Sequence, residues 1–273
     1  MASMRAVAPV RPVAPWIGGK RRLAERIVER IEAVPHELYC EPFLGMGGVF
    51  LRRRNAPPAE VINDLSRDVA TLFRVLQRHY QAFLEMLRWQ LTTRADFERL
   101  MATPPDTMTD LERSARFLYL QRCGFGGKVT GRSFGVSYAT GARFDVTKVV
   151  PLLEEVHCRL AGVVIECLPW QACIAKYDRP GALFYLDPPY WGSEGDYGQG
   201  FGREDFDALA AVLGGLQGGF ILSLNDTPEV RRTFRSFQVE AVQTVYSVGG
   251  GSSSKPVREL LIASRRSRAS RRR

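Results

Sequence analysis

Short apolar runs alternate with amphipathic segments along much of the chain, and this rhythm predicts an α/β fold. Leu23, Ile27, Val28 and Ile31 recur at helical spacing and predict a helix over residues 20–33. Apolar runs predict buried strands in six segments: ELYCE, AEVIND, AGVVIECLPW, ALFYLDPPY, GGFILSLND and VRELLIAS. The expected architecture is a mostly parallel central sheet with helices between its strands.

Helices are expected between the last of these strands. The segments REDFDALAAVLGGLQ and TPEVRRTFRS carry helical patterns. In the second, Thr227 is the expected N-cap and Pro228 occupies the first helical position.

Residues 81–158 interrupt the alternation. They begin with a helical pattern, FLEMLRWQL, and continue into a section rich in glycine, aromatic and basic residues. Strand–helix alternation resumes near Val163. We therefore expect one α/β domain formed by residues 1–80 and 159–264, with residues 81–158 as a mainly helical inserted domain.

Most of the net charge of +9 comes from the C-terminal end of the chain. The last ten residues, SRRSRASRRR, contain six arginines and no acidic residue, and the rest of the chain carries +3. Residues 265–273 are expected to be a disordered basic tail that attracts phosphate backbones independently of sequence. A merely solubilising tail is the alternative.

Cysteine and histidine usage argues against metal and disulfide chemistry. The five cysteines contain no CxxC pair, and the three histidines are isolated from one another. No apolar run approaches the ~20 residues of a membrane span, and the N-terminus lacks the apolar core of a secretory signal. We expect a cytoplasmic protein with reduced thiols, monomeric, and with no metal or membrane partner.

A glycine-rich turn, EPFLGMGGVF, separates a predicted strand from the expected start of a helix. Glycines there let backbone approach a ligand closely and present amide groups to it. Asp64 stands at the end of the next strand, where an acid can accept hydrogen bonds from both ribose hydroxyls. The spacing is not GxGxxG and the P-loop lysine is missing, so we expect an adenosine-containing cofactor without a pyrophosphate.

The segment LFYLDPPY places a rigid corner at the carboxyl end of a buried strand, where ligands bind in open α/β sheets. Pro188 and Pro189 fix φ and remove two N–H donors. The Asp187 carboxylate and a proline carbonyl then offer two acceptors for the hydrogens of one –NH2 group. Tyr190 adds a ring on which a planar base can stack, worth about 1–3 kcal/mol.

Two acceptors suit methylation of an aromatic amine, which is a poor nucleophile because its lone pair is delocalised into the ring. Hydrogen bonds to both protons favour a more tetrahedral nitrogen, whose lone pair can point at an electrophile. The same acceptors stabilise the positive charge that develops on this nitrogen.

Four segments in this order, PWIGGK, EPFLGMGG, IND and DPPY, resemble the Dam-like (D12 class, group alpha) DNA adenine N6-methyltransferases, which use S-adenosylmethionine. The resemblance covers most of residues 15–263 and implies a Rossmann-like methyltransferase fold. It implies a catalytic corner made of Asp187, Pro188, Pro189 and Tyr190. It also implies cofactor contacts by Trp16, Lys20, Phe43, Gly45, Gly47, Asp64, Trp170 and Asp187. The strand that contains SLND would support the base pocket.

One segment departs from the family pattern. After the third strand, the family commonly has an acid followed by an aromatic residue, and both contact the cofactor adenine. Here CLPWQ places Pro169 and Trp170 at these positions. We therefore expect stacking through Trp170, without the hydrogen bond to the adenine amine.

The resemblance makes the insertion the target-recognition region. A base within a duplex cannot reach such a pocket, so the target adenine must be extruded from double-stranded DNA. Arg122, Lys128 and Arg132 flank glycines and are the expected contacts to phosphates or bases. Residues 192–202, GSEGDYGQGFG, are either a flap over the extruded base or a simple loop.

Two alternatives remain at this point. A related enzyme could methylate another amine or amide, such as cytosine N4 or a protein glutamine. The chain could instead be a DNA-binding module without activity, which would require a damaged corner or cofactor loop.

Overall fold

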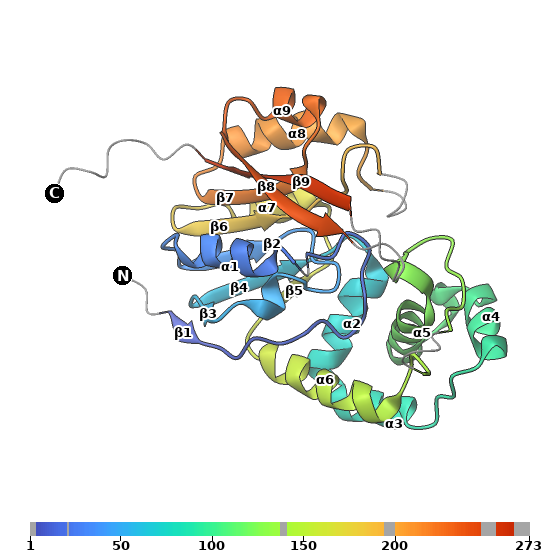
Figure 1. Ribbon diagram of the computed structural model, residues 1–273. Coiled ribbons are helices and arrows are strands. Elements are labelled where there is room, and N and C mark those ends of the chain that lie inside the picture. The colour runs from blue at the N-terminus through green and yellow to red at the C-terminus, as the bar shows by residue number, and fades with distance from the viewer. Residues whose placement is uncertain (1–3, 21, 137–140, 194–199, 247–254, 265–273) are drawn as a thin grey trace.

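The computed structural model describes residues 4–20, 22–136, 141–193, 200–246 and 255–264 (Figure 1). A seven-stranded sheet runs through the molecule in the order β5-β4-β2-β6-β7-β9-β8. Its first five strands are parallel, and β9 runs antiparallel to both neighbours. The bounds are β2 Leu38–Glu41, β4 Ala59–Asn63, β5 Val164–Glu166, β6 Ala182–Leu186, β7 Gly219–Asn225, β8 Gln238–Tyr246 and β9 Lys255–Ala263. The predicted α/β fold with a mostly parallel central sheet is confirmed.

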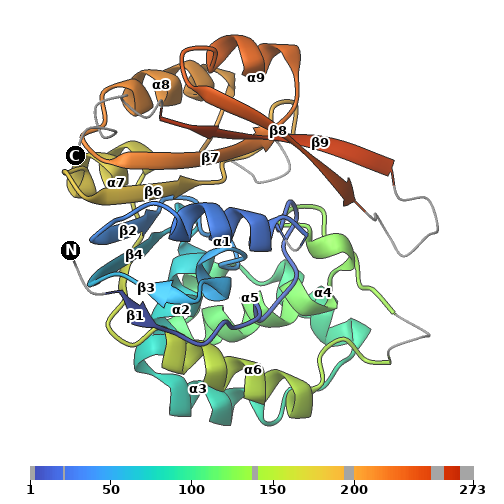
Figure 2. The ribbon, with the colours of Figure 1, turned by 60° about the vertical axis from the view of Figure 1, so that its left-hand side comes forward.

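Helices cover both faces of the sheet (Figure 2). On one face lie α1 (Ala24–Glu32) and α2 (Arg67–Arg78), and on the other α7 (Trp170–Tyr177), α8 (Arg203–Gly214) and α9 (Pro228–Thr233). In β6, Leu183 and Tyr185 enter the first core and Phe184 and Leu186 the second. This strand is therefore buried on both sides, as its continuous apolar run predicts.

Helix capping follows the sequence at α9. The Thr227 side chain accepts a hydrogen bond from the Val230 amide at 3.2 Å, and Pro228 begins the helix. The predicted N-cap is thus confirmed.

The helix expected after the glycine-rich turn is wrong. The chain forms only the 3-10 turn η1 (Phe50–Arg52) and then β3 (Asn55–Ala56), which pairs with β1 (Arg5–Ala6). Few residues lie between η1 and β4, and Pro57 and Pro58 are among them. A proline has a fixed φ and no N–H group, and it disfavours the helical conformation of the residue before it. A longer helix therefore does not fit between η1 and β4.

The insertion is mainly helical, as expected. It contains α3 (Tyr80–Leu87), α4 (Arg94–Ala102), the 3-10 turn η2 (Pro105–Thr107), α5 (Asp110–Cys123), the 3-10 turn η3 (Phe125–Gly127) and α6 (Val146–Arg159). Phe117 and Tyr119 of α5 are buried in the same core cluster as α1 and α2. The insertion therefore packs on the face of the sheet that α1 and α2 cover, where it extends the same hydrophobic core (Figure 1).

Candidate active site

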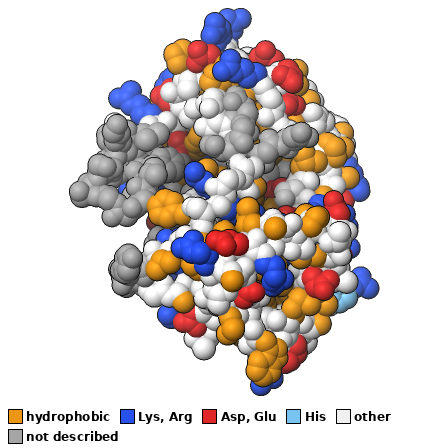
Figure 3. All heavy atoms as spheres, turned by 90° about the vertical axis from the view of Figure 1, so that its right-hand side faces the viewer, with side chains coloured by type: hydrophobic (Ala, Val, Ile, Leu, Met, Phe, Trp, Pro, Cys, Tyr) orange, Lys and Arg blue, Asp and Glu red, His pale blue; other side chains and the backbone are white. Residues whose placement is uncertain are grey.

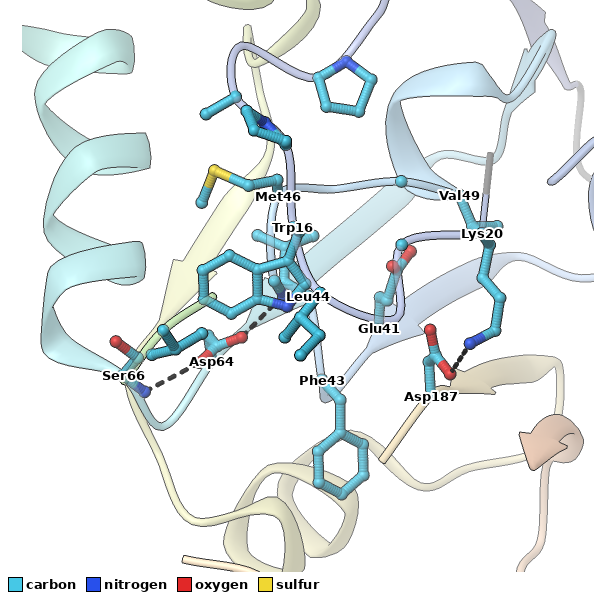
Figure 4. A pocket seen from close by; sticks show the side chains of 18 of the residues that line it. Trp16, Lys20, Glu41, Phe43, Leu44, Met46, Val49, Asp64, Ser66 and Asp187 are labelled. Atoms are coloured by element: carbon cyan, nitrogen blue, oxygen red, sulfur yellow. Dashed lines mark hydrogen bonds and ion pairs between the residues drawn. The ribbon is translucent and has the colours of Figure 1, made fainter. Parts of the chain in front are cut away.

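The carboxyl ends of β2, β4 and β6 meet at one edge of the sheet, where a cavity of about 970 Å3 opens (Figure 4). Because β2 lies between β4 and β6, the residues that follow these strands come together around it. This volume lies within the range of small-molecule sites. The predicted site residues that line the cavity are Trp16, Lys20, Phe43, Gly45, Asp64, Arg122, Trp170, Asp187 and Pro189.

Asp64 follows β4 and is held by two backbone amides. Its Oδ2 accepts a hydrogen bond from Gly45 N–H at 2.7 Å, and its Oδ1 accepts one from Ser66 N–H at 2.8 Å. Burial raises the pKa of the Asp64 carboxyl to about 6, although the two amides oppose this rise. Each oxygen keeps a further lone pair with which it can accept a hydroxyl group of a ligand.

Two of the three glycines of the turn, Gly45 and Gly47, serve different purposes. Both have positive φ, 52° at Gly45 and 70° at Gly47. A Cβ on Gly45 would lie 2.6 Å from Trp16 Nε1, whereas one on Gly47 would lie 3.0 Å from Leu51 Cγ in the core. Gly45 thus lets the Trp16 indole pack against bare backbone in the cavity wall, and Gly47 points away from the cavity.

Trp16 is fixed in turn by the insertion. The α5 side chain of Gln121 donates through Nε2 to Pro15 O at 2.8 Å and to Gly127 O at 2.7 Å, and Ile17 N–H donates to the same Gly127 carbonyl at 3.0 Å. The helical insertion therefore supports the N-terminal segment that lines the cavity.

Asp187 follows β6 and is held by two side chains. Lys20 Nζ lies 2.5 Å from its Oδ1, and Ser223 Oγ of β7 donates to the same oxygen at 3.0 Å. Burial raises the pKa of the Asp187 carboxyl, and the adjacent Lys20 ammonium opposes this rise. Lys20 is only 3% exposed, whereas the Asp187 side chain is 20% exposed, so the ion pair is buried on the lysine side and open on the carboxylate side.

The corner after Asp187 is half-buried and tied to β7. The Asn225 side chain accepts from Trp191 N–H through Oδ1 and donates to Trp191 O through Nδ2, both at 3.0 Å. The Tyr190 ring centroid lies 4.5 Å from Lys20 Nζ. The corner thus presents a carboxylate, the Pro189 backbone and an aromatic ring beside the cavity.

Glu41, which the sequence analysis did not single out, also lines the cavity. It ends β2, is 2% exposed, and accepts a hydrogen bond from Tyr39 OH at 2.8 Å. Burial raises the pKa of the Glu41 carboxyl to about 8. Figure 4 shows it between Asp64 and Asp187. The sequence feature that could have indicated Glu41 as a site residue is its position at the end of a buried strand, directly before the glycine-rich turn.

An aromatic group closes another part of the cavity. The rings of Phe43 and Trp170 lie 6.4 Å apart, and Phe201 packs against them at 5.7 Å and 6.3 Å. Pro169 is the residue before α7 and brings Trp170 to its first position. Of the flap predicted at 192–202, residues 194–199 lie outside the described residues.

The three predicted DNA-binding residues differ in their surroundings. Arg122 donates to Val13 O and to Arg143 O, the latter at 3.3 Å, and Arg132 donates to Gln121 Oε1 at 2.9 Å and Lys128 O at 3.0 Å. Burial lowers the pKa of both guanidinium groups. Lys128 is exposed. On the face shown in Figure 3, basic side chains alternate with acidic and apolar ones.

Within the described residues, no group of three or more histidine, cysteine or acidic side chains is placed to hold a metal ion. None of the helices in that part of the chain is long and apolar enough to cross a membrane. The five cysteines are free thiols.

The residues fit an adenosine-containing methyl donor. A turn without side chains, a carboxylate at the end of the second strand and flat aromatic walls match a nucleoside, and Asp187 stands at the opposite side of the same cavity. The arrangement can therefore hold a cofactor beside a carboxylate that accepts hydrogen bonds from an amine.

Comparisons with known proteins agree with this geometry. The model of the D12 class N6 adenine-specific DNA methyltransferase family matches residues 16–248. The Type II methyltransferase M1.LlaDCHI of Lactococcus lactis subsp. cremoris is 26% identical over 93% of this chain and 95% of its own length. A DNA adenine methylase of Haemophilus influenzae is 26% identical over 92% of each chain, and one of Vibrio cholerae is 26% identical over 90% of this chain and 93% of its own. The chain belongs to the D12 class N6 adenine-specific DNA methyltransferases.

Proposed function

We propose that this enzyme acts as a cytoplasmic monomer and transfers the methyl group of S-adenosylmethionine to N6 of an adenine extruded from double-stranded DNA. One observation carries the proposal. Asp187 and Pro189 of the predicted catalytic corner line the same cavity as Gly45 and Asp64 of the predicted cofactor turn. The relative named a Type II methyltransferase supports a role in restriction–modification.

Trp16, Gly45, Asp64 and Trp170 would hold the adenosine part of the cofactor, which supplies a methyl group on a positively charged sulfur. Asp64 would accept hydrogen bonds from the ribose hydroxyls. Glu41 would face the positive charges of the methionine part. An incoming cation favours the charged form of a carboxyl, so Glu41 would release its proton on binding.

Asp187 and the Pro188 carbonyl would accept the two N6 hydrogens of the target adenine, while Tyr190 stacks on the base. Neither proline can donate a competing hydrogen bond to these acceptors, because neither has an N–H group. The acceptors would stabilise the positive charge that develops on N6. The C–N bond would form as the sulfur–methyl bond breaks and leaves a neutral thioether, and one N6 proton would pass along its hydrogen bond to the Asp187 carboxylate and from there to solvent.

For DNA, we propose that Lys128 contacts a phosphate, while Arg122 and Arg132 hold the loop that presents it. The exposure of Lys128 and the internal hydrogen bonds of the two arginines support this division. Residues 265–273 lie outside the described residues, and their six arginines would add sequence-independent attraction. Deleting them should reduce the slope of log K against log salt by up to about 5, and an unchanged slope would make the tail incidental.

The test of the proposal is the identity of the methylated base. Purified enzyme, S-adenosylmethionine and duplex DNA should yield N6-methyladenine in a nucleoside digest analysed by mass spectrometry. Single-molecule sequencing of the same DNA reports the sequence context. Formation of N4-methylcytosine, or no methylated nucleoside despite bound cofactor, would overturn it.

A further inference from the structure

The Asp187 carboxylate is held from one side only. Lys20 and Ser223 both contact Oδ1, at 2.5 Å and 3.0 Å. Within the described part of the chain, Oδ2 has no hydrogen-bond partner. The two oxygens of this carboxylate are therefore chemically distinct before any substrate arrives.

The direction of the hydrogen bonds behind Asp187 follows from counting donors. Ser223 Oγ lies 2.9 Å from Tyr185 OH, and both side chains are fully buried. A serine hydroxyl has one proton, and Ser223 donates it to Asp187. Tyr185 must then donate to Ser223, so a chain of hydrogen bonds runs from Tyr185 through Ser223 to Oδ1.

Lys20 is the cation of this arrangement. Its ammonium also donates to Gly18 O at 3.2 Å and lies over the Tyr190 ring. It is 3% exposed, and a lysine is rarely that buried unless it is paired. The side chain comes from the loop before α1 and reaches Asp187, which follows β6 (Figure 4).

We propose that Lys20 and Ser223 are positioning residues, which fix Oδ1 of Asp187 so that Oδ2 accepts the hydrogen bond of the target amine. This rests on the proposed function of the site. Lys20 also keeps Asp187 ionised, so its role extends beyond the cofactor contact that the family resemblance implies for it.

Ionisation needs such help because burial and the Glu259 carboxylate of β9 both raise the pKa of Asp187. Two further titratable groups near it, Glu41 of β2 and Tyr185 of β6, are buried and keep their protons at neutral pH because burial raises the pKa of each. Lys20 is the cation that opposes the effect of burial and of Glu259 on the pKa of Asp187. A protonated carboxyl would lose acceptor strength toward an amine.

The experiment compares pH profiles of the single-turnover methylation rate at saturating cofactor and DNA. With Lys20→Met, the acid limb of the profile should move to higher pH by one unit or more. On the limb, each unit of this shift should make the variant about tenfold slower than the wild type at the same pH. Lys20→Arg restores the charge and should keep the limb near that of the wild type. Ser223→Ala should move the acid limb in the same direction by a smaller amount. Ser223→Thr, which keeps the hydroxyl group, should leave the limb where it is in the wild type.

Three results would overturn the proposal. An unchanged limb with a uniformly lower rate would make Lys20 and Ser223 merely structural. A faster reaction of Lys20→Met, or tighter DNA binding, would mean that the ammonium over Tyr190 occupies the place of the target base and must be displaced. If the acid limbs of Ser223→Ala and Ser223→Thr lie at the same pH, the Ser223 hydroxyl group does not affect the ionisation of Asp187.

A second readout does not depend on activity. In protein labelled with 13C at aspartate carboxyls, the titration of Asp187 in the free enzyme should shift to higher pH in Lys20→Met. If the wild type makes no methylated DNA, the proposed function fails while this titration still tests the positioning role. If the wild type is active and the titration is unchanged, the positioning role alone fails.

Discussion

Asp64 and Asp187 are the same residue type at equivalent places, directly after the strands on either side of β2. Their environments differ. Asp64 accepts hydrogen bonds from the backbone amides of Gly45 and Ser66, whereas Asp187 accepts from the side chains of Lys20 and Ser223. One carboxylate is fixed by the fold of a turn, and the other by two residues distant in sequence.

This difference matches what each carboxylate is proposed to do. A group that only binds a ligand needs a fixed position, which backbone amides provide whatever the neighbouring side chains are. A group that accepts from a reacting amine also needs a tuned charge state, and a cation beside a carboxyl group favours its charged form. On this proposal, binding and chemistry are separated at the ends of β4 and β6, the two strands that flank β2.

The largest effect that would test this separation is expected at Asp187. Asp187→Ala should lower the methyl-transfer rate by roughly 10²–10³-fold or more, because an interaction with the developing charge is lost. Cofactor affinity, measured by calorimetry, should change far less. Asp187→Asn, which keeps the shape and one acceptor oxygen, controls for the Lys20 ammonium left unpaired. Near-wild-type formation of N6-methyladenine by folded Asp187→Ala would refute the assignment.

The opposite pattern is expected at Asp64. Asp64→Ala should weaken S-adenosylmethionine binding by about 10–100-fold, the range for losing hydrogen bonds to a charged group. The rate at saturating cofactor should stay near that of the wild type. A variant with unchanged affinity and a lower saturated rate would place Asp64 in the chemistry and abolish the contrast.

The sequence predicted both of these carboxylates for the same physical reason. A strand end in an open α/β sheet is a ligand position whatever the side-chain packing, so Asp64 and Asp187 could be placed from hydrophobic patterning alone. The six strands expected from apolar runs are present, while β8 was missed because QVEAVQTVY, at the sheet edge, contains no continuous apolar run.

The partners of Asp187 could not be predicted in the same way. Lys20 and Ser223 are 167 residues before it and 36 residues after it, and only the folded sheet brings them to one oxygen. The basic residues of the insertion show the same limit. Arg116 reads as a surface cation, yet it is buried and donates to Leu100 O at 2.7 Å.

A smaller effect is expected from the turn that holds Asp64. Gly45→Ala places a methyl group against the Trp16 indole at a positive φ, which costs about 1–2 kcal/mol in conformation alone. The variant should unfold at lower urea concentration and bind cofactor more weakly. Gly48→Ala is the matched control, since its Cβ would meet nothing closer than 3.7 Å and its φ is not positive. Equal losses of stability in both variants would mean that the backbone conformation at Gly45 is unimportant.

The last prediction concerns the pH dependence of stability at Glu41, which lies between the two aspartates. Its folded pKa is about 8 against an ordinary 4.5, so the native state keeps a proton that the unfolded state has lost. Stability without cofactor should therefore fall as pH rises from 4.5 to 8, by up to about 1.4 kcal/mol per pH unit. Asp64 adds to this fall only up to about pH 6.

The interval between pH 6 and 8 isolates Glu41 from Asp64. Urea unfolding of Glu41→Gln should show a shallower loss of stability across this interval than the wild type, because glutamine has no proton to lose. Identical slopes would mean that Glu41 is ionised throughout. It would then join Asp187 as a second charged group beside the methyl donor, and the contrast between a fixed and a tuned carboxylate would extend to a third strand end.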